Sequence, residues 1–159
     1  MTIDEIMDVV HSHGVNLVEV TGGEPLLHKN VHPLMSRLCD EGHEVLLETS
    51  GSLDISDVDP RVRIIMDLKP PGSGEEHRNR YENIEALKEI DEVKFVIADE
   101  KDYQWSVSQC EENALPDKQR VIFSPVHGVL EPHLLSQWVL RDRLNVTIGL
   151  QLHKLLHVE

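Results

Sequence analysis

The sequence predicts an α/β fold with mostly parallel strands, arranged as an open sheet or a partial barrel. Six short apolar segments are mostly separated by segments with helical periodicity, an alternation that requires strands joined by right-handed crossovers. The apolar segments are almost continuous, which is typical of parallel strands buried on both faces. No linker or internal repeat interrupts the pattern, so residues 1–159 are expected to form a single domain.

The N-terminal part of the chain is expected to contain two helices on either side of a strand. Thr2 followed by Glu5 has the spacing of a capping box, and the helix that it begins can end at Gly14. The residues Val15 to Val20 then favour a strand. A second helix is expected from about Val31 to Glu41.

Downstream, the same alternation continues to the end of the chain. Apolar residues at helical spacing predict helices around Tyr81 to Ile90 and near Asp102 to Asn113. Pro132 suits the first turn of a further helix. The remaining strands are expected at Glu44 to Thr49, Arg63 to Leu68, Val93 to Ala98, Val121 to Phe123 and Val146 to Leu152.

The composition argues against several classes of partner. The formal charge is −14, from 29 acidic and 15 basic residues, and so acidic a surface repels nucleic-acid backbones and anionic membranes. No apolar run approaches a membrane span in length, and the N-terminus lacks the layout of a signal peptide. The only two cysteines, Cys39 and Cys110, are far apart, which fits a reducing cytoplasm. We therefore expect a cytoplasmic protein that binds neither nucleic acid nor membranes.

Polar residues gather where the predicted strands end, which is where parallel β/α proteins bind their ligands. Glu24 is either a solvated loop acid or an acceptor for a bound amine. Asp67 and Lys69 are two apart and can form a structural ion pair, whereas Lys94 inside an apolar strand requires a partner. The polar segments are Thr21-Gly22-Gly23-Glu24-Pro25, Glu48-Thr49-Ser50-Gly51, Asp67-Leu68-Lys69-Pro70-Pro71, Ser124-Pro125-Val126 and Gln151-Leu152-His153-Lys154.

Together, these segments resemble those of radical S-adenosylmethionine enzymes, and within that superfamily the 7-carboxy-7-deazaguanine synthase family. The first segment is similar to the Gly-Gly-Glu-Pro motif of the superfamily, and the segments that begin at Asp67 and Gln151 narrow the resemblance to the family. The resemblance runs from about Val18 to the end of the chain. It implies a partial (β/α)6-type radical S-adenosylmethionine barrel with mostly parallel strands, whose first strand is missing from this chain.

The resemblance also implies a reaction and its cofactors. The reaction is the radical ring contraction of 6-carboxy-5,6,7,8-tetrahydropterin to 7-carboxy-7-deazaguanine, a carbon–nitrogen lyase step in the biosynthesis of queuosine and other 7-deazapurines. Enzymes of the family reduce S-adenosylmethionine at a [4Fe–4S] cluster and use Mg²⁺. The resemblance further implies an electron donor such as flavodoxin and a homodimer, and unpaired backbone beside the first predicted strand also favours association.

Two sets of site residues follow from the resemblance, while no catalytic residue is assigned. Glycines without β-carbons let a ligand reach backbone groups directly. The residues expected to hold S-adenosylmethionine are Gly22, Gly23, Glu24, Ser50, Lys69 and Ser124. The residues expected on the pterin side are Glu48, Asp67, His153 and Lys154.

The chain departs from the family in its cysteines. The cluster needs three closely spaced thiolates that leave one iron open to the cofactor, and two thiols cannot form that site. Cys39, on an apolar helix stripe, and Cys110 are both expected to be buried core thiols. We therefore expect no metal ligand in this chain, an N-terminus that lacks the first strand and the cluster loop, and no ring contraction by the chain as written.

Two other functions remain open from the sequence alone. One is a different radical enzyme, such as a glycyl-radical activase, although the segments that begin at Asp67 and Gln151 count against it. The other is a non-catalytic domain that binds a nucleoside or a partner protein, which accounts for the absence of three clustered cysteines.

Overall fold

The structure, a computed structural model, describes residues 1–151 and 154. Its strands are β1 (Leu17–Val20), β2 (Glu44–Thr49), β3 (Arg63–Asp67), β4 (Glu92–Ile97), β5 (Arg120–Pro125) and β6 (Thr147–Ile148). Its helices are α1 (Ile3–His13), α2 (Val31–Asp40), α3 (Glu82–Ala86), α4 (Glu100–Asn113), α5 (Leu115–Lys118) and α6 (Pro132–Asp142). Three short 3-10 helices are η1 (Pro25–Leu27), η2 (Pro71–Ser73) and η3 (Glu76–Arg78).

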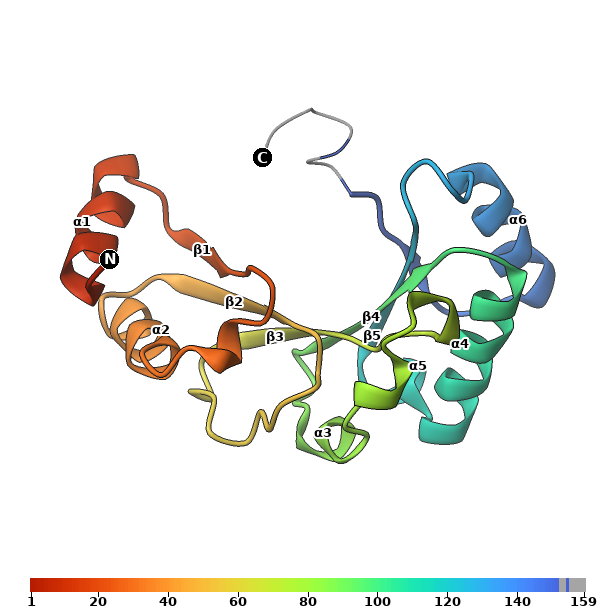
Figure 1. Ribbon diagram of the computed structural model, residues 1–159, viewed down its shortest axis with the longest axis horizontal. Helices are drawn as coiled ribbons and strands as arrows, with labels where there is room; N and C mark the ends of the chain where they lie inside the picture. Colours follow the sequence, from red (N-terminus) through yellow and green to blue (C-terminus); the bar gives the residue numbers. More distant parts are fainter. Residues whose placement is uncertain (152–153, 155–159) are drawn as a thin grey trace.

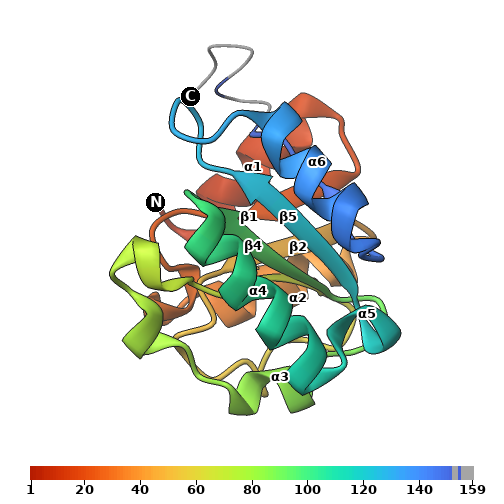
Figure 2. The ribbon, with the colours of Figure 1, turned by 90° about the vertical axis from the view of Figure 1, so that its right-hand side faces the viewer.

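The six strands form one sheet in which the spatial order follows the chain order, and all neighbouring strands are parallel. Because the order never reverses, successive right-handed crossovers place their helices on the same face, and the sheet curves around the other face. Figure 1 shows the resulting crescent, with α1 and β1 at one end and α6 at the other. Turned by 90°, the molecule shows α4 and α6 lying over the outer face of β4 and β5 (Figure 2). The α/β prediction of a partial barrel is thus confirmed.

The four central strands, β2 to β5, are buried mainly on the outer face, and β1 and β6 contain no buried residue, so the expectation of burial on both faces is wrong for this sheet. In β2, Val45, Leu47 and Thr49 are buried under the helices. Leu46 and Glu48 alternate with them and remain partly exposed on the inner face. In the part of the chain that the structure describes, helices cover only the outer face, and the inner face can therefore carry charged side chains without full desolvation.

Several expected elements are confirmed within a few residues. The Thr2–Glu5 capping box is present, Gly14 ends α1 in the left-handed conformation, and β2 has both predicted bounds. Within the part of the chain that the structure describes, no helix combines the length and the apolar character that crossing a membrane requires.

Two elements are shorter than the sequence predicted, by half or more of their length. The helix expected around Tyr81 to Ile90 is limited to α3, because Leu87 turns to extended backbone and the Asp91 carboxylate accepts the hydrogen bond of the Lys88 N–H (2.8 Å). The strand expected from Val146 to Leu152 is limited to β6. Its described pairing is with β5 alone, over two residues.

Candidate functional site

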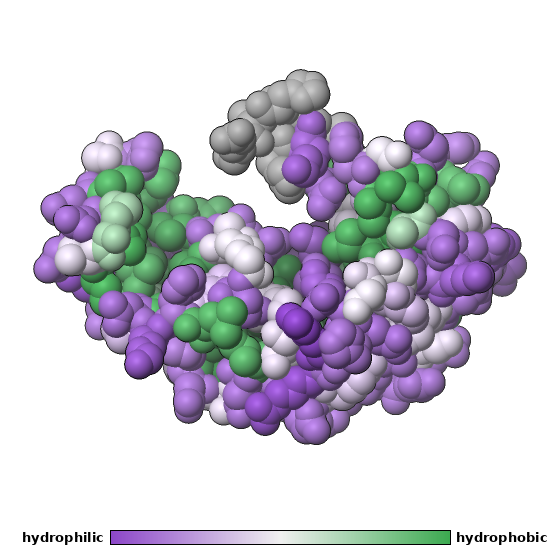
Figure 3. Space-filling model, in the orientation of Figure 1, coloured by the Kyte–Doolittle hydropathy of each residue, from purple (hydrophilic) through white to green (hydrophobic). Residues whose placement is uncertain are grey.

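The polar ends of β1, β2 and β3 meet in two adjoining hollows, one on the inner face of the sheet and one among the loops at its carboxyl edge, because the carboxyl ends of parallel strands reach the same edge. One is a pocket of about 100 Å³ and the other a more open hollow of about 660 Å³. Gly23, Ser50 and Lys69 line both. The space-filling view shows the molecule hollowed between its two ends (Figure 3). The smaller pocket is also lined by Thr21, Gly22, Glu48, Thr49, Ile65, Asp67 and Lys94.

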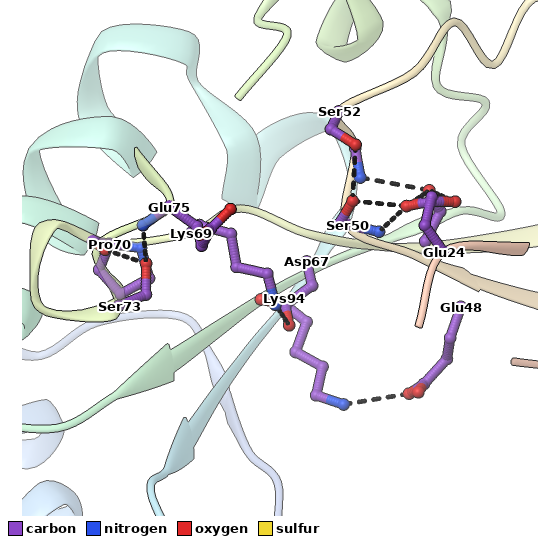
Figure 4. A network of polar contacts seen from close by, with 12 residues as sticks. Glu24, Glu48, Ser50, Ser52, Asp67, Lys69, Pro70, Ser73, Glu75 and Lys94 are labelled. Carbon is purple, nitrogen blue, oxygen red and sulfur yellow. Dashed lines mark hydrogen bonds and ion pairs between the residues drawn. The ribbon is translucent and has the colours of Figure 1, made fainter. Parts of the chain in front are cut away.

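The carboxylate of Glu24 joins the loop after β1 to the end of β2. Its Oε1 accepts hydrogen bonds from the Leu26 N–H (3.1 Å) and the Thr49 hydroxyl (2.9 Å). Its Oε2 accepts the Ser50 N–H (2.8 Å) and the Ser50 hydroxyl, whose oxygen also lies 2.9 Å from that of Ser52 (Figure 4). Both carboxylate oxygens are therefore occupied by the protein, and Glu24 is not the solvated loop acid that the sequence left open.

The two glycines before Glu24 differ in what the fold requires of them. Gly22 has a φ of +148°, which side chains disfavour, so the turn itself demands a glycine there. Gly23 lies outside the left-handed region, and a β-carbon added to it would meet no described atom within 4 Å. The fold therefore leaves room for a side chain at position 23, and close approach of a ligand is a reason for its absence.

Two ion pairs lie side by side on the inner face. The Lys94 ammonium on β4 reaches across β3 to the Glu48 carboxylate on β2, with 3.0 Å between Nζ and Oε1 (Figure 4). This is the partner that a lysine within an apolar strand requires. The Lys69 ammonium lies 2.7 Å from Asp67 Oδ2, which confirms the predicted ion pair. This part of the inner face thus carries two carboxylates, each paired with an ammonium group, rather than an excess of charge of one sign.

The Asp67 carboxylate is the least satisfied group of this cluster. Its Oδ1 is buried and has no hydrogen-bond partner in the described part of the chain. Burial raises the pKa of Asp67 above its usual 3.8, although Lys69 and Lys94 lower it. Burial and the nearby Glu48 charge likewise raise the pKa of Glu19 on β1. Both acids bind protons more readily than free carboxyls do.

The pKa of Asp67 predicts a pH-dependent cost to stability. The folded chain holds the proton of the Asp67 carboxyl more tightly than the unfolded chain does, so this proton stabilises the fold. Its contribution to the free energy of unfolding is complete below pH 3.8 and is lost as the pH rises through the raised pKa of the folded state. We expect Asp67→Asn to lose this dependence, so that its stability relative to the wild type improves between about pH 3.5 and pH 7 in urea unfolding series.

A matched control for that series is Asp54→Asn. The Ser56 N–H and Arg80 lower the pKa of Asp54, so its stabilisation is present above pH 3.8 and is lost as the pH falls. The two variants should therefore diverge from the wild type in opposite directions. Parallel curves for Asp67→Asn and the wild type at every pH would contradict the expected titration.

Comparison with known proteins adds to this geometry. A 7-carboxy-7-deazaguanine synthase of Chlorobaculum tepidum is 50% identical to the chain over 157 residues, which cover 97% of this chain and 71% of that protein. The chain belongs to the 7-carboxy-7-deazaguanine synthase family. A synthase of Koribacter versatilis is 41% identical, with coverage of 97% of this chain and 75% of the relative. This membership decides against the glycyl-radical activase alternative.

The fold of the synthase family member also resembles solved structures. QueE from Escherichia coli matches with a TM-score of 0.74 at 18% identity, over 95% of this chain and 64% of that chain. The Streptococcus suis protein SuiB, solved with its precursor peptide SuiA, matches with a TM-score of 0.62 at 14% identity, over 93% of this chain and 41% of that chain. At these identities the likeness concerns the fold alone. A scan against models of protein families finds no match.

Most of the residues that the synthase resemblance assigns lie together, but Ser124 and Lys154 do not join them. Ser124 on β5 is only 2% exposed and lines neither hollow; a β-carbon on Gly149 would lie 2.7 Å from its Oγ. Lys154 is exposed and lines neither hollow, and His153 lies outside the described residues. The residues brought together are Gly22, Gly23, Glu24, Glu48, Ser50, Asp67 and Lys69.

The two cysteines do not fit the iron–sulfur cluster that the synthase family implies. Cys39 lies on α2 and Cys110 on α4, towards opposite ends of the crescent. Cys39 is partly exposed rather than buried as expected, whereas Cys110 is buried, which raises the pKa of its thiol to about 12. A thiol of this kind is a poor metal ligand. Across residues 1–151 and 154, no three His, Cys, Asp or Glu side chains are grouped to hold a metal ion.

Sequence reasoning did not single out three polar residues that fasten the loops of the site, namely Thr49, Asn79 and Asn83. Thr49 follows Glu48 directly, and the alternation along β2 could have assigned it to the buried face beside Glu24. Asn79 and Asn83 bind the backbone of the two strand-end loops, but they lie in a polar stretch without a pattern of its own. No local signal in the sequence distinguishes these two amides from other loop residues.

Proposed function

We propose that the chain forms the S-adenosylmethionine-binding and pterin-binding wall of a 7-carboxy-7-deazaguanine synthase. The reaction is the conversion of 6-carboxy-5,6,7,8-tetrahydropterin to 7-carboxy-7-deazaguanine with loss of ammonia, in queuosine and 7-deazapurine biosynthesis. The observation that carries the proposal is the hollow in which the ends of β1, β2 and β3 present glycine backbone, a hydroxyl and two ion pairs together, in a chain of this family.

The cofactor side of the proposal uses the loops after β1, β2 and β3. The backbone of Gly22 and Gly23 receives the methionyl ammonium, and the Lys69 ammonium receives the methionyl carboxylate. Ser50 donates both its N–H and its hydroxyl to Glu24, so its hydroxyl oxygen serves as an acceptor for a ribose hydroxyl of the cofactor. Glu24 acts mainly by fixing Ser50, since its oxygens already accept hydrogen bonds from the chain. S-adenosylmethionine supplies the radical chemistry when bound, while the protein supplies orientation and a site shielded from water.

The substrate side of the proposal uses the charged inner face. The aminopyrimidinone ring of a pterin carries adjacent N–H donors that suit the carboxylates of Glu48 and Asp67. The pterin carboxylate suits an ammonium group such as that of Lys94. His153 and Lys154 retain their assignment to the substrate, and Ser124 to the cofactor, as part of the proposal.

The wider proposal includes Mg²⁺, a homodimer, a cytoplasmic location and an electron donor such as flavodoxin. It assigns the [4Fe–4S] cluster to no residue of this chain, because Cys39 and Cys110 do not suit a three-thiolate site. We therefore predict that the purified 159-residue chain binds both small molecules but forms no product. Product formation by that chain with a competent reductant would overturn this part.

Calorimetric titration of the purified chain with S-adenosylmethionine and with 6-carboxypterin tests the binding site. We expect Gly23→Ala to keep the melting temperature of the wild type, because its β-carbon meets open space, but to weaken S-adenosylmethionine binding by about tenfold or more. Gly22→Ala is the contrast, since it strains the turn and should lower the melting temperature as well.

The outcomes separate the candidate functions. Unchanged affinity of Gly23→Ala would contradict the assignment of the cofactor to this turn. If the wild-type chain bound neither molecule, a non-catalytic interaction domain would be the better account, an alternative that the misfit of the two cysteines to a cluster favours.

A further inference from the structure

The side chain of Asn79 holds the backbone of Lys69 through both of its polar atoms. Asn79 Oδ1 accepts the Lys69 N–H at 2.9 Å, and Asn79 Nδ2 donates to the Lys69 carbonyl, also at 2.9 Å. The amide therefore pairs with Lys69 as a neighbouring strand would, at a point where β3 has already ended. The chain between the two residues, which includes η2 and η3, is closed into a loop by a single side chain.

Neighbouring residues hold the rest of this loop in place. Asp102, buried on α4, accepts the Gly72 N–H (2.8 Å) and the Ala98 N–H (3.1 Å), which ties η2 to the end of β4. Just after this loop, the buried Asn83 donates to the carbonyls of Gly51 (3.0 Å) and Leu53 (2.7 Å), which ties α3 to the loop after β2. The loop and the segment that follows it are thus anchored at several points, and among the described residues only Asn79 is hydrogen-bonded to the backbone of Lys69.

The backbone of Lys69 decides where its ammonium group can reach. A lysine side chain has several rotatable bonds, so its Nζ samples a wide volume unless its backbone is fixed. Here the side chain is partly buried, and its Nζ lies 2.7 Å from Asp67 at the junction of the two hollows. When the ammonium group is already held in place, less side-chain conformational entropy is lost when an anion binds to it.

We propose that Asn79 is a positioning residue that presents the Lys69 ammonium to the carboxylate of the bound cofactor. This inference rests on the proposed function, because it takes S-adenosylmethionine as the ligand of Lys69. Asn79 lines neither hollow, so it acts through Lys69 rather than by touching the ligand. Its effect should therefore be confined to ligands that carry the carboxylate.

The test compares the affinities of the full chain for S-adenosylmethionine and for decarboxylated S-adenosylmethionine, measured by calorimetry. We expect the wild type to prefer the carboxylate-bearing ligand by about tenfold or more, since a charge-assisted contact is at stake. Asn79→Asp keeps an acceptor for the Lys69 N–H but loses the donor to the carbonyl, and should remove most of that preference. The matched control is Asn113→Asp, which loses a comparable donor to the Gln109 carbonyl, far along α4.

A double-mutant cycle with Lys69→Ala tests whether Asn79 influences the affinity through Lys69. If Asn79 acts through Lys69, Asn79→Asp should change neither affinity further in the Lys69→Ala background. If Asn79→Asp weakened the binding of both ligands equally, the proposal would be overturned, because a residue with a merely structural role affects both affinities. A preference that survives Lys69→Ala would also overturn it, together with the assignment of the carboxylate to Lys69, while S-adenosylmethionine binding as such would still support the proposed function. Failure of the wild type to bind either ligand would overturn both.

Discussion

Glu24→Ala is expected to abolish measurable S-adenosylmethionine binding, a loss of at least about 100-fold, and to lower the free energy of unfolding by about 2–4 kcal/mol. The reason is that the partly buried donors of Leu26, Thr49 and Ser50 share this one carboxylate. Without it they lose their acceptor, and the loop after β1 is no longer fastened to β2. Calorimetric titration and urea unfolding measure the two effects separately.

The conservative variant and a control complete that experiment. Glu24→Gln keeps Oε1 as an acceptor but turns an NH₂ group towards the Ser50 N–H and hydroxyl, so an intermediate loss is expected. Glu112→Ala removes an exposed acid on α4 and should leave the affinity unchanged. Wild-type affinity in Glu24→Ala would show that ligand binding does not depend on this network.

The largest loss of stability without loss of affinity is expected for Asp91→Ala. Asp91 is 0% exposed, and its carboxylate accepts hydrogen bonds from the Ile64 N–H (2.8 Å) and the Lys88 N–H (2.8 Å). Its Oδ1 also lies 3.3 Å from the Lys88 ammonium. Removing one partner of a buried network of this kind costs about 3–5 kcal/mol. Since Ile64 lies at the start of β3, opposite the ligand-binding edge, the affinity of the folded fraction should not change.

Urea unfolding at neutral pH measures the loss in Asp91→Ala, with ligand titration carried out at a temperature where the variant is still folded. Asp117→Ala, which removes an exposed acid on α5, is the control and should stay within about 0.5 kcal/mol of the wild type. A loss below about 1 kcal/mol in Asp91→Ala would contradict the inference that this carboxylate joins the turn after α3 to the sheet.

The periodicity of the chain was sufficient for the α/β class with parallel strands, because hydrophobic patterning is a local property, while the resemblance decided for a partial barrel over an open sheet. Local sequence also predicted the capping box, from the spacing of Thr2 and Glu5, and both bounds of β2. It failed where a tertiary contact replaced a local one. The helix expected up to Ile90 ends early, since the Asp91 carboxylate accepts the N–H of Lys88.

For the site, the sequence by itself determined which residues stand at the strand ends, and parallel strands bring those ends to one edge. Gly23, Asp67 and Lys69 therefore lie in or beside the same hollow, as expected from their order. Only the tertiary structure decided how the polar groups are used. The Glu24 carboxylate is occupied by Ser50, 26 residues away, and Lys69 is held by Asn79, 10 residues away. Such pairings depend on loop positions in space, for which no periodic pattern in the chain provides a signal.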